Sequence, residues 1–276
     1  MRRQATAVLD LTGASEAVRT ATRVWLVVFL QCLPDDLPPS FFGRMIQRRI
    51  EDLTGTCDPY RELKDKTNRF ALDLANSVRS SLTHSQDSIR HTLRLSAAAN
   101  IIDFGAKRYL TIDEARNALL SASEVPLAGG FEDEVVHKLG NAESVLIIAD
   151  NAGEIVFDML LCEQLPCRPT VAVRSAPVIN DVTMREAIDI GFFRHADIIE
   201  IGSDMPGLYF PNASSSLLLR MVTADVVISK GQGNYEGLSD TEFDGYFLFR
   251  VKCETVARHV GIDIGKNVLI KSRREK

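Results

Sequence analysis

Short apolar runs alternate with amphipathic stretches from residue 144 to the end of the chain. The runs are brief and rich in β-branched residues, as buried parallel strands are, and they predict strands at 145–149, 169–173, 197–201, 225–229, 245–251 and 267–270. The stretches between them have apolar residues at helical spacing and predict helices at 154–164, 182–190, 214–223 and 253–260. This order predicts a parallel, doubly wound sheet with right-handed crossovers.

The first half of the chain shows helical periodicity and no strand-like alternation. We expect helices over 15–33, from Pro38-Pro39 through Leu53, from Asp58-Pro59 past Leu72, from Ile89 to Ile102 and from Asp113 to Ser121. The apolar run from Val24 to Leu33 is about half as long as a membrane span, so it predicts a buried helix instead.

The two halves together predict an α/β protein. We expect an all-helical N-terminal domain at residues 1–128 and a C-terminal Rossmann-like domain at residues 129–276, with a mostly parallel sheet flanked by helices. The glycine pair Gly129-Gly130 is the expected boundary between them.

Composition and charge limit the partners that this chain is expected to have. Of 276 residues, 45% are hydrophobic and 25% charged, as in globular proteins, and the net charge of −5 argues against nucleic acid. We also expect no membrane partner. Five widely spread cysteines without a signal peptide predict reduced thiols in a cytoplasmic protein, and Cys162 and Cys167 lack the partners of a zinc site. The sequence leaves the oligomeric state open.

Asp150 and Asn151, which follow the first predicted strand, are the first candidates for chemistry. Ligands of open α/β sheets bind outside the carboxyl ends of the strands. A carboxylate and an amide oxygen at that place are suitable donors for a divalent cation. The alternative is a turn in which one of the two residues only caps the next helix.

Two further strands also end in polar groups. Asp181 follows the strand at 169–173, where it either caps the next helix or faces Asp150 as a second carboxylate. Lys230 follows the strand at 225–229 and precedes a glycine-rich segment that starts at Gly231 and includes Asn234. Glycines let backbone N–H groups approach a phosphate, and a lysine supplies a point charge. We expect all these groups to converge on one edge of the sheet.

Three familiar phosphate motifs do not fit. The third glycine of Gly231, Gly233 and Gly237 comes one residue too late for a dinucleotide fingerprint, and the motif follows a late strand. No Gly-Lys-Ser or Gly-Lys-Thr completes a Walker loop. Ala152 stands where a phosphatase of the Asp-x-Asp type needs its second acid.

Two polar groups interrupt the helical half. Asn100 and Asp103 precede Gly105, and the spacing alone favours a plain helix C-terminus, with Gly105 as its terminator, over a functional segment. Lys64 and Asn68 lie four residues apart on one helix face after Asp58, and a solvated face is the alternative to a functional one.

In this order and spacing, three motifs resemble the metal-dependent damage-control phosphatases, a family with the domain of unknown function 89 and an ARMT-like fold. The motifs are Ala149-Asp150-Asn151-Ala152-Gly153-Glu154, Asn180-Asp181-Val182-Thr183 and Lys230-Gly231-Gln232-Gly233-Asn234-Tyr235-Glu236. The segments around Asp58 and Asn100, and the ending from Val251 to Gly265, are similar to the same family. The chain is most similar to its short, stand-alone prokaryotic branch.

The resemblance implies a phosphatase that acts on small phosphometabolites, such as sugar phosphates or phosphorylated cofactor fragments, with Mn²⁺, Co²⁺, Ni²⁺ or Mg²⁺. The roles implied by position are metal ligand for Asp150, Asn151 and Asp181, phosphate contact for Lys230, and proximity to substrate for Asn100 and Asp103. Short members often begin with a Cys-x-x-Cys segment before an Arg-Gln helix. This chain begins Met1-Arg2-Arg3-Gln4, and Cys32-Leu33-Pro34-Asp35 does not replace that pair.

The expected mechanism uses a cation with open positions for water and a phosphate oxygen, since positioning and charge supply most of phosphoryl-transfer catalysis. A metal-bound water is the preferred nucleophile, and direct attack by Asp150 or Asp181 stays open. Arg174 and Glu154 are further substrate-binding candidates, although exposed helix starts explain them equally. Two other functions stay open: a phosphate- or nucleotide-binding module without hydrolysis, and an adenosyl-methionine-dependent methyltransferase, which the missing Gly-x-Gly loop disfavours.

Overall fold

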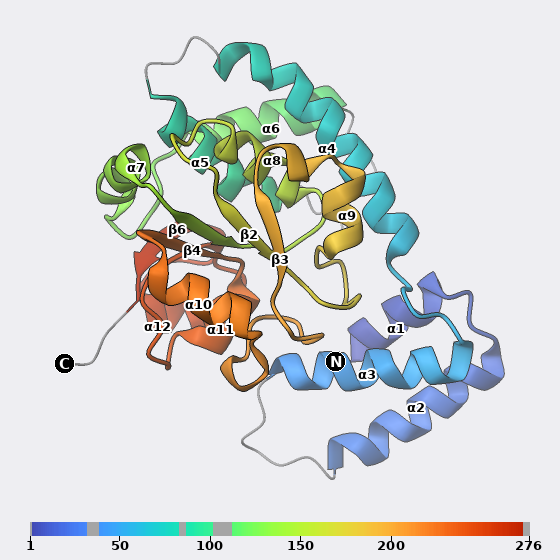
Figure 1. Cartoon of the computed structure of the whole chain (residues 1–276). Coiled ribbons are helices and arrows are strands. Elements are labelled where there is room, and N and C mark those ends of the chain that lie inside the picture. Colours follow the sequence, from blue (N-terminus) through green and yellow to red (C-terminus); the bar gives the residue numbers. More distant parts are fainter. Residues whose placement is uncertain (1, 32–38, 83–86, 102–111, 273–276) are drawn as a thin grey trace.

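A computed structural model describes residues 2–31, 39–82, 87–101 and 112–272. Its centre is a six-stranded sheet in the order β3-β2-β1-β4-β5-β6 (Figure 1). The strands are β1 (Val145–Ile148), β2 (Thr170–Val173), β3 (Asp197–Glu200), β4 (Val226–Lys230), β5 (Tyr246–Arg250) and β6 (Asn267–Lys271). All neighbours are parallel except β5 and β6, which are antiparallel. The predicted strands and the mostly parallel sheet are confirmed.

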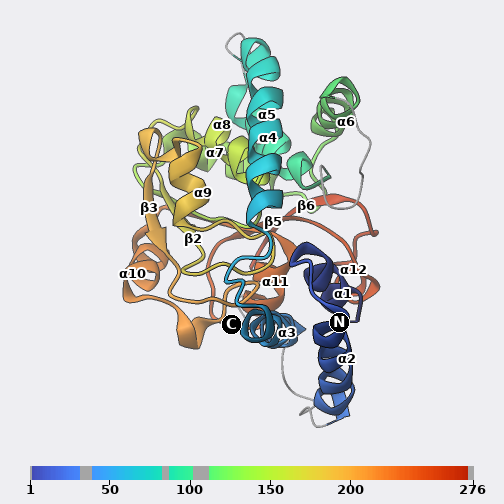
Figure 2. The same cartoon turned by 90° about the vertical axis from the view of Figure 1, so that its right-hand side faces the viewer.

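Helices cover both faces of the sheet (Figures 1 and 2). One face carries α4 (Arg61–Leu82), α5 (Ser88–Ala98), α6 (Ile112–Glu124), α7 (Glu132–Asn141), α8 (Glu154–Cys162) and α9 (Met184–Asp189). The other carries α10 (Ser215–Thr223), α11 (Gln232–Leu238) and α12 (Glu254–Val260). Along β1, Val145 and Ile147 pack on the first side, and Leu146 and Ile148 on the second. This alternation explains why the strand is apolar at every position.

Two helices that pack beside the sheet were not predicted from the sequence. The α7 helix begins shortly after Gly130, and α11 contains Gly233 and Gly237. Glycine disfavours helix, so packing on β4 and β5, and not intrinsic propensity, must stabilise α11. Short 3₁₀ turns η1 (Ala99–Ile101), η2 (Phe192–Arg194) and η3 (Phe210–Asn212) complete the connections.

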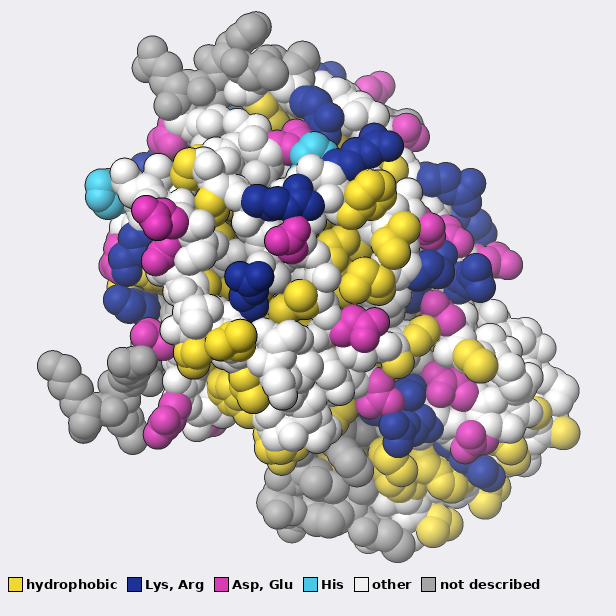
Figure 3. Space-filling view, in the orientation of Figure 1, with side chains coloured by type: hydrophobic (Ala, Val, Ile, Leu, Met, Phe, Trp, Pro, Cys, Tyr) yellow, Lys and Arg dark blue, Asp and Glu magenta, His cyan; other side chains and the backbone are white. Residues whose placement is uncertain are grey.

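The first three helices form a small bundle at one end of the molecule (Figure 2). They are α1 (Arg2–Leu11), α2 (Glu16–Gln31) and α3 (Pro39–Thr54), and they share a core that includes Val8, Leu26 and Ile50. Apolar side chains gather on the surface there (Figure 3). Val24, Val27 and Val28 of α2 are 62%, 48% and 55% exposed. The prediction of a buried helix is therefore wrong for this face of α2.

The largest hydrophobic core joins the two halves of the chain. It contains Leu93 and Leu119 from before residue 129 together with Ile147 and Leu248 of the sheet. The division into domains at residue 129 stays a prediction. No helix in the described ranges is both long and apolar enough to cross a membrane.

Candidate metal and phosphate site

The candidate site lies where the strand order changes direction. The neighbouring strands β1 and β4 lead to opposite edges of the sheet, through β2 and β3 on one side and β5 and β6 on the other. Asp150 lies two residues beyond the end of β1, and Lys230 is the last residue of β4. The crevice at such a switch point is the usual ligand site of doubly wound sheets.

Asp150, Asn151 and Asp181 come together at this edge. The Val182 N–H donates to the Asp150 carbonyl oxygen at 2.9 Å, and Asn151 and Asp181 form an isolated antiparallel bridge. The Asn151 amide nitrogen donates to Asp150 Oδ2 at 2.6 Å. The three residues therefore form one polar cluster built by two βα turns.

The helix-capping alternative is wrong for both turns. The N-cap of α8 is Gly153, which makes no side-chain cap. The N-cap of α9 is Thr183, whose capping box is completed by Glu186. Asp150 and Asp181 are instead buried, with 8% and 5% of their surface exposed.

Gly231, the residue directly after β4, lies against the candidate site. Its φ is 83°, and a Cβ atom at this position would overlap the Asp150 carboxylate. Its N–H donates to the Leu248 carbonyl oxygen at 3.1 Å and is thus already used within the sheet. Gly231 thus packs closely against the Asp150 carboxylate. The expected phosphate contact of the segment that begins at Gly231 stays a prediction.

Lys230 lies in the same network, but its ammonium faces helix α8. Its Nζ atom donates to Glu154 Oε1 at 2.6 Å and to Asp158 Oδ1 at 2.7 Å. Glu154 Oε2 accepts from the Asn100 amide at 2.7 Å and from the Asn151 amide at 3.4 Å. Lys230 is thus connected to Asp150 through Glu154 and Asn151, and its predicted phosphate contact stays untested. Of the other predicted residues, Asp103 lies outside the described ranges.

Arg174 forms a buried ion pair with Asp181. Its Nε donates to Asp181 Oδ2 at 2.6 Å, and its Nη2 donates to Asn234 Oδ1 at 3.0 Å. Its Nη1 is buried and has no hydrogen-bond partner among the described residues. Arg174 and Glu154 are 1% and 4% exposed, so the alternative that placed them at solvated helix starts is wrong.

Helix α4 reaches the site through Asn68. Asn68 Oδ1 accepts from the Gly153 N–H at 2.6 Å. Lys64, one turn earlier, pairs with Asp58 at 2.8 Å and Glu186 at 2.9 Å. Both side chains are buried, which rules out the solvated face.

Sequence reasoning missed two groups that belong to this network. Asp158 lies one turn after Glu154, and its Oδ1 also accepts from Ser96 Oγ at 2.5 Å. A signal was present, because acids at 154 and 158 share a face of an otherwise apolar helix. Ser96 gave no signal, since only the packing of α5 on α8 brings it to Asp158.

The buried charges of this network do not balance. Four buried carboxylates, on Asp150, Glu154, Asp158 and Asp181, face two buried cations, Lys230 and Arg174. Burial, with the charges of Asp181 and Glu154, raises the pKa of the Asp150 carboxyl to about 8. Burial also raises the pKa of Asp181, which Arg174 offsets only in part. The excess of negative charge marks this edge as a candidate cation site.

Lys252 is a further cation at the edge. It is exposed and lies two residues beyond β5, and its charge acts to lower the pKa of both Asp150 and Asp181. Lys230, by contrast, is fully engaged: despite burial, the charges of Asp158 and Glu154 raise its pKa above the usual range. Of the two lysines, Lys252 is therefore the one whose ammonium is exposed to solvent.

The residues present fit a hard divalent cation. Two buried carboxylates and an adjacent amide are the donor types that Mg²⁺ and Mn²⁺ take, and the excess negative charge is what such an ion neutralises. Within the described chain, no group of three or more His, Cys, Asp or Glu side chains could hold a metal. The amide of Asn151 is thus needed to complete the candidate set.

Comparison with known proteins agrees with the motifs. A family model described as the damage-control phosphatase ARMT1-like domain matches residues 2–268. A damage-control phosphatase of Archaeoglobus fulgidus is 29% identical over 228 residues, covering 81% of this chain and 79% of its own length. Damage-control phosphatase PH1575 of Pyrococcus horikoshii is 26% identical over 240 residues, with 85% and 82% covered. Uncharacterized protein MJ0202 of Methanocaldococcus jannaschii is 33% identical over 248 residues, with 84% and 80% covered.

The fold agrees as well. The crystal structure of the DUF89 family protein PH1575 of P. horikoshii superposes with a TM-score of 0.89 at 23% identity, covering 98% of this chain and 95% of that one. At this identity the likeness establishes the shared fold.

Proposed function

Because the chain belongs to the damage-control phosphatase ARMT1-like domain family, we propose that it is a divalent-metal-dependent phosphatase of small phosphometabolites. The substrates we expect are sugar phosphates or phosphorylated cofactor fragments. One observation carries the proposal: two carboxylates and an amide from separate βα turns meet at the switch point of the sheet, with more buried negative charge than the protein's own cations offset.

In the proposed site, Asp150, Asn151 and Asp181 hold the cation, and their donor types suit Mn²⁺, Co²⁺, Ni²⁺ or Mg²⁺. The bound ion would polarise the phosphoryl group and supply an activated water. Arg174 fixes one oxygen of Asp181, and Asn151 donates to one oxygen of Asp150, so each carboxylate keeps its other oxygen for the ion. Preorganised charge of this kind supplies most of the catalysis in phosphoryl transfer.

We assign the phosphate contact to Lys252 and Nη1 of Arg174. Lys252 is exposed and acts electrostatically on both aspartates, and Arg174 Nη1 is a buried donor without a partner among the described residues. Lys230 then has a different task from the one its position in the family motif implies. With two carboxylates at hydrogen-bond distance, it holds Glu154 in the orientation that receives Asn100 and Asn151.

Asn100 is a candidate for substrate recognition. Its amide nitrogen is fixed by Glu154, while its Oδ1 is buried and lacks a partner among the described residues. An unpartnered buried acceptor is costly unless a ligand or water satisfies it. A hydroxyl of a sugar phosphate has the donor that this oxygen requires.

A phosphate-release screen tests the proposal. The purified protein is assayed with p-nitrophenyl phosphate and a panel of sugar phosphates, with each of the four metals and with a chelator. We expect turnover that requires metal and disappears in Asp150→Asn, while the control Asp73→Asn, at an exposed position of α4, retains it. Near-normal turnover in Asp150→Asn would disprove the assigned site. Metal-dependent thermal stabilisation with no hydrolysis of any substrate would favour a binding module, and stabilisation by adenosyl-methionine a methyltransferase.

A further inference from the structure

The loop between β2 and α9, which carries Asp181, contains a strained residue. Ile179 has a φ of 46°, and it is the one non-glycine residue with positive φ among those described. A β-branched residue is a clear outlier in this region, because its side chain crowds the backbone. Such a conformation persists only where the surroundings impose it, and it is often found at functional sites.

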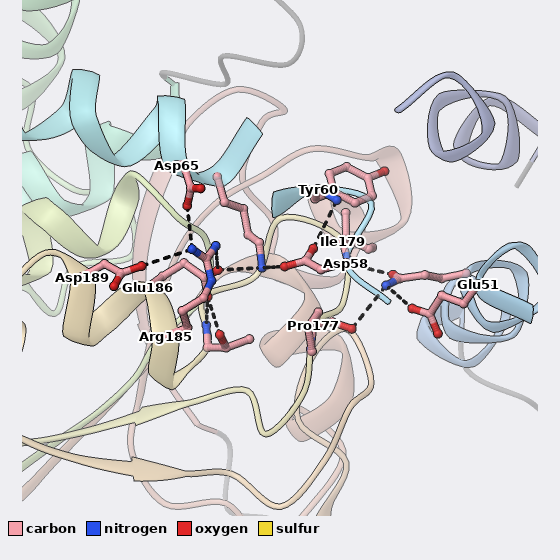
Figure 4. A network of polar contacts seen from close by, with 12 residues as sticks. Glu51, Asp58, Tyr60, Asp65, Pro177, Ile179, Arg185, Glu186 and Asp189 are labelled. Atoms are coloured by element: carbon pink, nitrogen blue, oxygen red, sulfur yellow. Dashed lines mark hydrogen bonds and ion pairs between the residues drawn. The ribbon is translucent and has the colours of Figure 1, made fainter. Parts of the chain in front are cut away.

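Gln47 of α3 forms hydrogen bonds with the backbone around this residue. Its Oε1 accepts from the Ile179 N–H at 2.9 Å, and its Nε2 donates to the Pro177 carbonyl oxygen at 3.2 Å (Figure 4). The Nε2 atom also donates to Glu51 Oε1 at 2.9 Å, which fixes the amide orientation. Gln47 is 1% exposed, so these bonds form away from water. One side chain of the N-terminal bundle thus binds the loop on both sides of Val178.

A second contact fixes the other end of the loop. Glu186 accepts from the Thr183 N–H at 2.8 Å and from the Thr183 hydroxyl. Lys64 of α4 pairs with Glu186 at 2.9 Å and with Asp58 at 2.8 Å (Figure 4). Asp181 therefore lies between two fixed points, one set by α3 and the other by α4.

The strained segment connects directly to the candidate ligands. The Asp181 N–H donates to the Val178 carbonyl oxygen at 3.0 Å, and the Ala152 N–H donates to the Asn180 carbonyl oxygen at 2.9 Å. A change of φ at Ile179 would rotate Asn180 and Asp181 away from the β1 turn. The position of Asp181 relative to Asp150 and Asn151 thus depends on the conformation of Ile179.

We propose that Gln47 is a positioning residue of the candidate metal site: it holds Ile179 in its left-handed conformation and so brings Asp181 to Asp150 and Asn151. The metal part of this inference rests on the proposed function. It also gives the N-terminal bundle a task, because α3 supplies a contact that the sheet domain lacks. Glycine at position 179 adopts positive φ without strain, so the need for Gln47 should largely disappear in Ile179→Gly.

A double-mutant cycle tests the proposal. Gln47→Met keeps the length and packing of the side chain and removes both hydrogen bonds. We expect it to weaken Mn²⁺ binding, measured by calorimetry, by ~10- to 100-fold, as removal of groups that orient metal ligands does. In the Ile179→Gly background, the same change should weaken binding by less than ~3-fold, because glycine holds this φ unaided. Arg48→Ala, which removes a contact of α3 with Asp204 but leaves the loop, is the control and should bind as the unsubstituted protein does.

Hydrogen exchange separates the two hypotheses. We expect Gln47→Met to speed exchange at the amides of residues 179–182, and the Ile179→Gly background to remove most of that difference. This readout does not need metal or turnover, so it tests the contact even if the chain binds no Mn²⁺, an outcome that would defeat the proposed function alone. Unchanged exchange and unchanged Mn²⁺ affinity in Gln47→Met would overturn the inference. An equal loss of affinity in both backgrounds would also overturn it, because it would show that Gln47 acts without Ile179.

Discussion

Lys64 and Lys230 are both buried between two carboxylates, yet their surroundings differ in charge. Around Lys64, burial is outweighed by the lysine and by Thr183, which hold the pKa of Glu186 below its usual value. Around Lys230, burial and Glu154 raise the pKa of Asp158 although Lys230 acts against them. The surroundings of the two acids differ: Glu186 has a second cation partner, Arg185, at 2.6 Å, whereas Asp158 lies near the further buried carboxylate of Glu154.

This difference separates a structural cluster from a candidate functional one. A charge network that satisfies its members holds two elements together, as Lys64 does for α4 and the α9 turn. A network that leaves its carboxylates short of positive charge is costly to fold and is more common where chemistry occurs. Substitutions in the two clusters should therefore have opposite consequences for stability and activity.

The largest effect is expected at Asp150. Asp150→Asn should lower metal-dependent turnover by at least ~10²- to 10³-fold, the scale seen when a single transition-state contact is removed. In metal-free buffer its melting temperature should be no lower than that of the unsubstituted protein, because burial disfavours the charged form of the Asp150 carboxyl and the amide of Asn carries no charge. Phosphate release and calorimetric melting check the two parts. An inactive variant with a much lower melting temperature would show that Asp150 mainly stabilises the fold.

Lys64 should behave in the opposite way. Lys64→Met removes the buried cation between Asp58 and Glu186 and leaves Glu186 its pair with the less buried Arg185; breaking a buried pair typically costs about 3–5 kcal/mol. Urea denaturation should show this loss in the free energy of unfolding. The control is Lys66→Met on the same helix, whose side chain is 69% exposed and should change stability by less than about 0.5 kcal/mol. A Lys64 variant as stable as the control would break the comparison.

Lys252 should affect rate more than stability. If its ammonium contacts the phosphate, Lys252→Ala should lower kcat/KM by ~10- to 150-fold, since a charged hydrogen bond is worth about 1.5–3 kcal/mol. Mn²⁺ affinity and the melting temperature should change little. The exposed Lys266→Ala is the control. A normal kcat/KM in Lys252→Ala would contradict the assignment of Lys252 and leave the phosphate contact to Arg174, or to Lys230 as the family motif implies.

The smallest expected effect is on the stability of the protein at acidic pH, through Glu186. The folded pKa of Glu186 lies below its ordinary 4.5, so its contribution to stability is present above that value and is lost as the pH falls through the folded pKa. Glu186→Gln should therefore show a shallower loss of stability than the unsubstituted protein as the pH falls below about 4.5. Urea denaturation at several acidic pH values measures the slope. If the free energy of unfolding fell equally steeply with pH in both proteins, the lowered pKa of Glu186 in the folded protein would be contradicted.

Local patterns predicted the sheet well because its strands are short, apolar and bounded by polar turns. The ends of all six predicted strands lie within one residue of those observed. The meeting of Asp150 and Asp181 was also predictable, since parallel strands place their carboxyl ends at one edge. The family followed from the same turns, and the family match confirms it.

Burial in the helical half could not be predicted in this way. Lys64 and Asn68 are polar residues on a helix, and only the packing of α4 beside the β1 turn makes them interior. The error on α2 has the reverse cause: Val24 and Val28 are apolar, but the small bundle buries only one side of the helix. Gln47 belongs to no motif, because the loop atoms that it contacts are backbone atoms about 130 residues away in the sequence.

Gly231 limits how this edge of the sheet can vary. The Asp150 carboxylate, which follows β1, occupies the volume that a side chain at position 231 would need. The residue after β4 therefore cannot be changed independently of the acid after β1. Even Gly231→Ala would place its Cβ atom 2.1 Å from Asp150 Oδ2, so the carboxylate would have to move. A library randomised at this single position should accordingly return glycine among its active clones and little else.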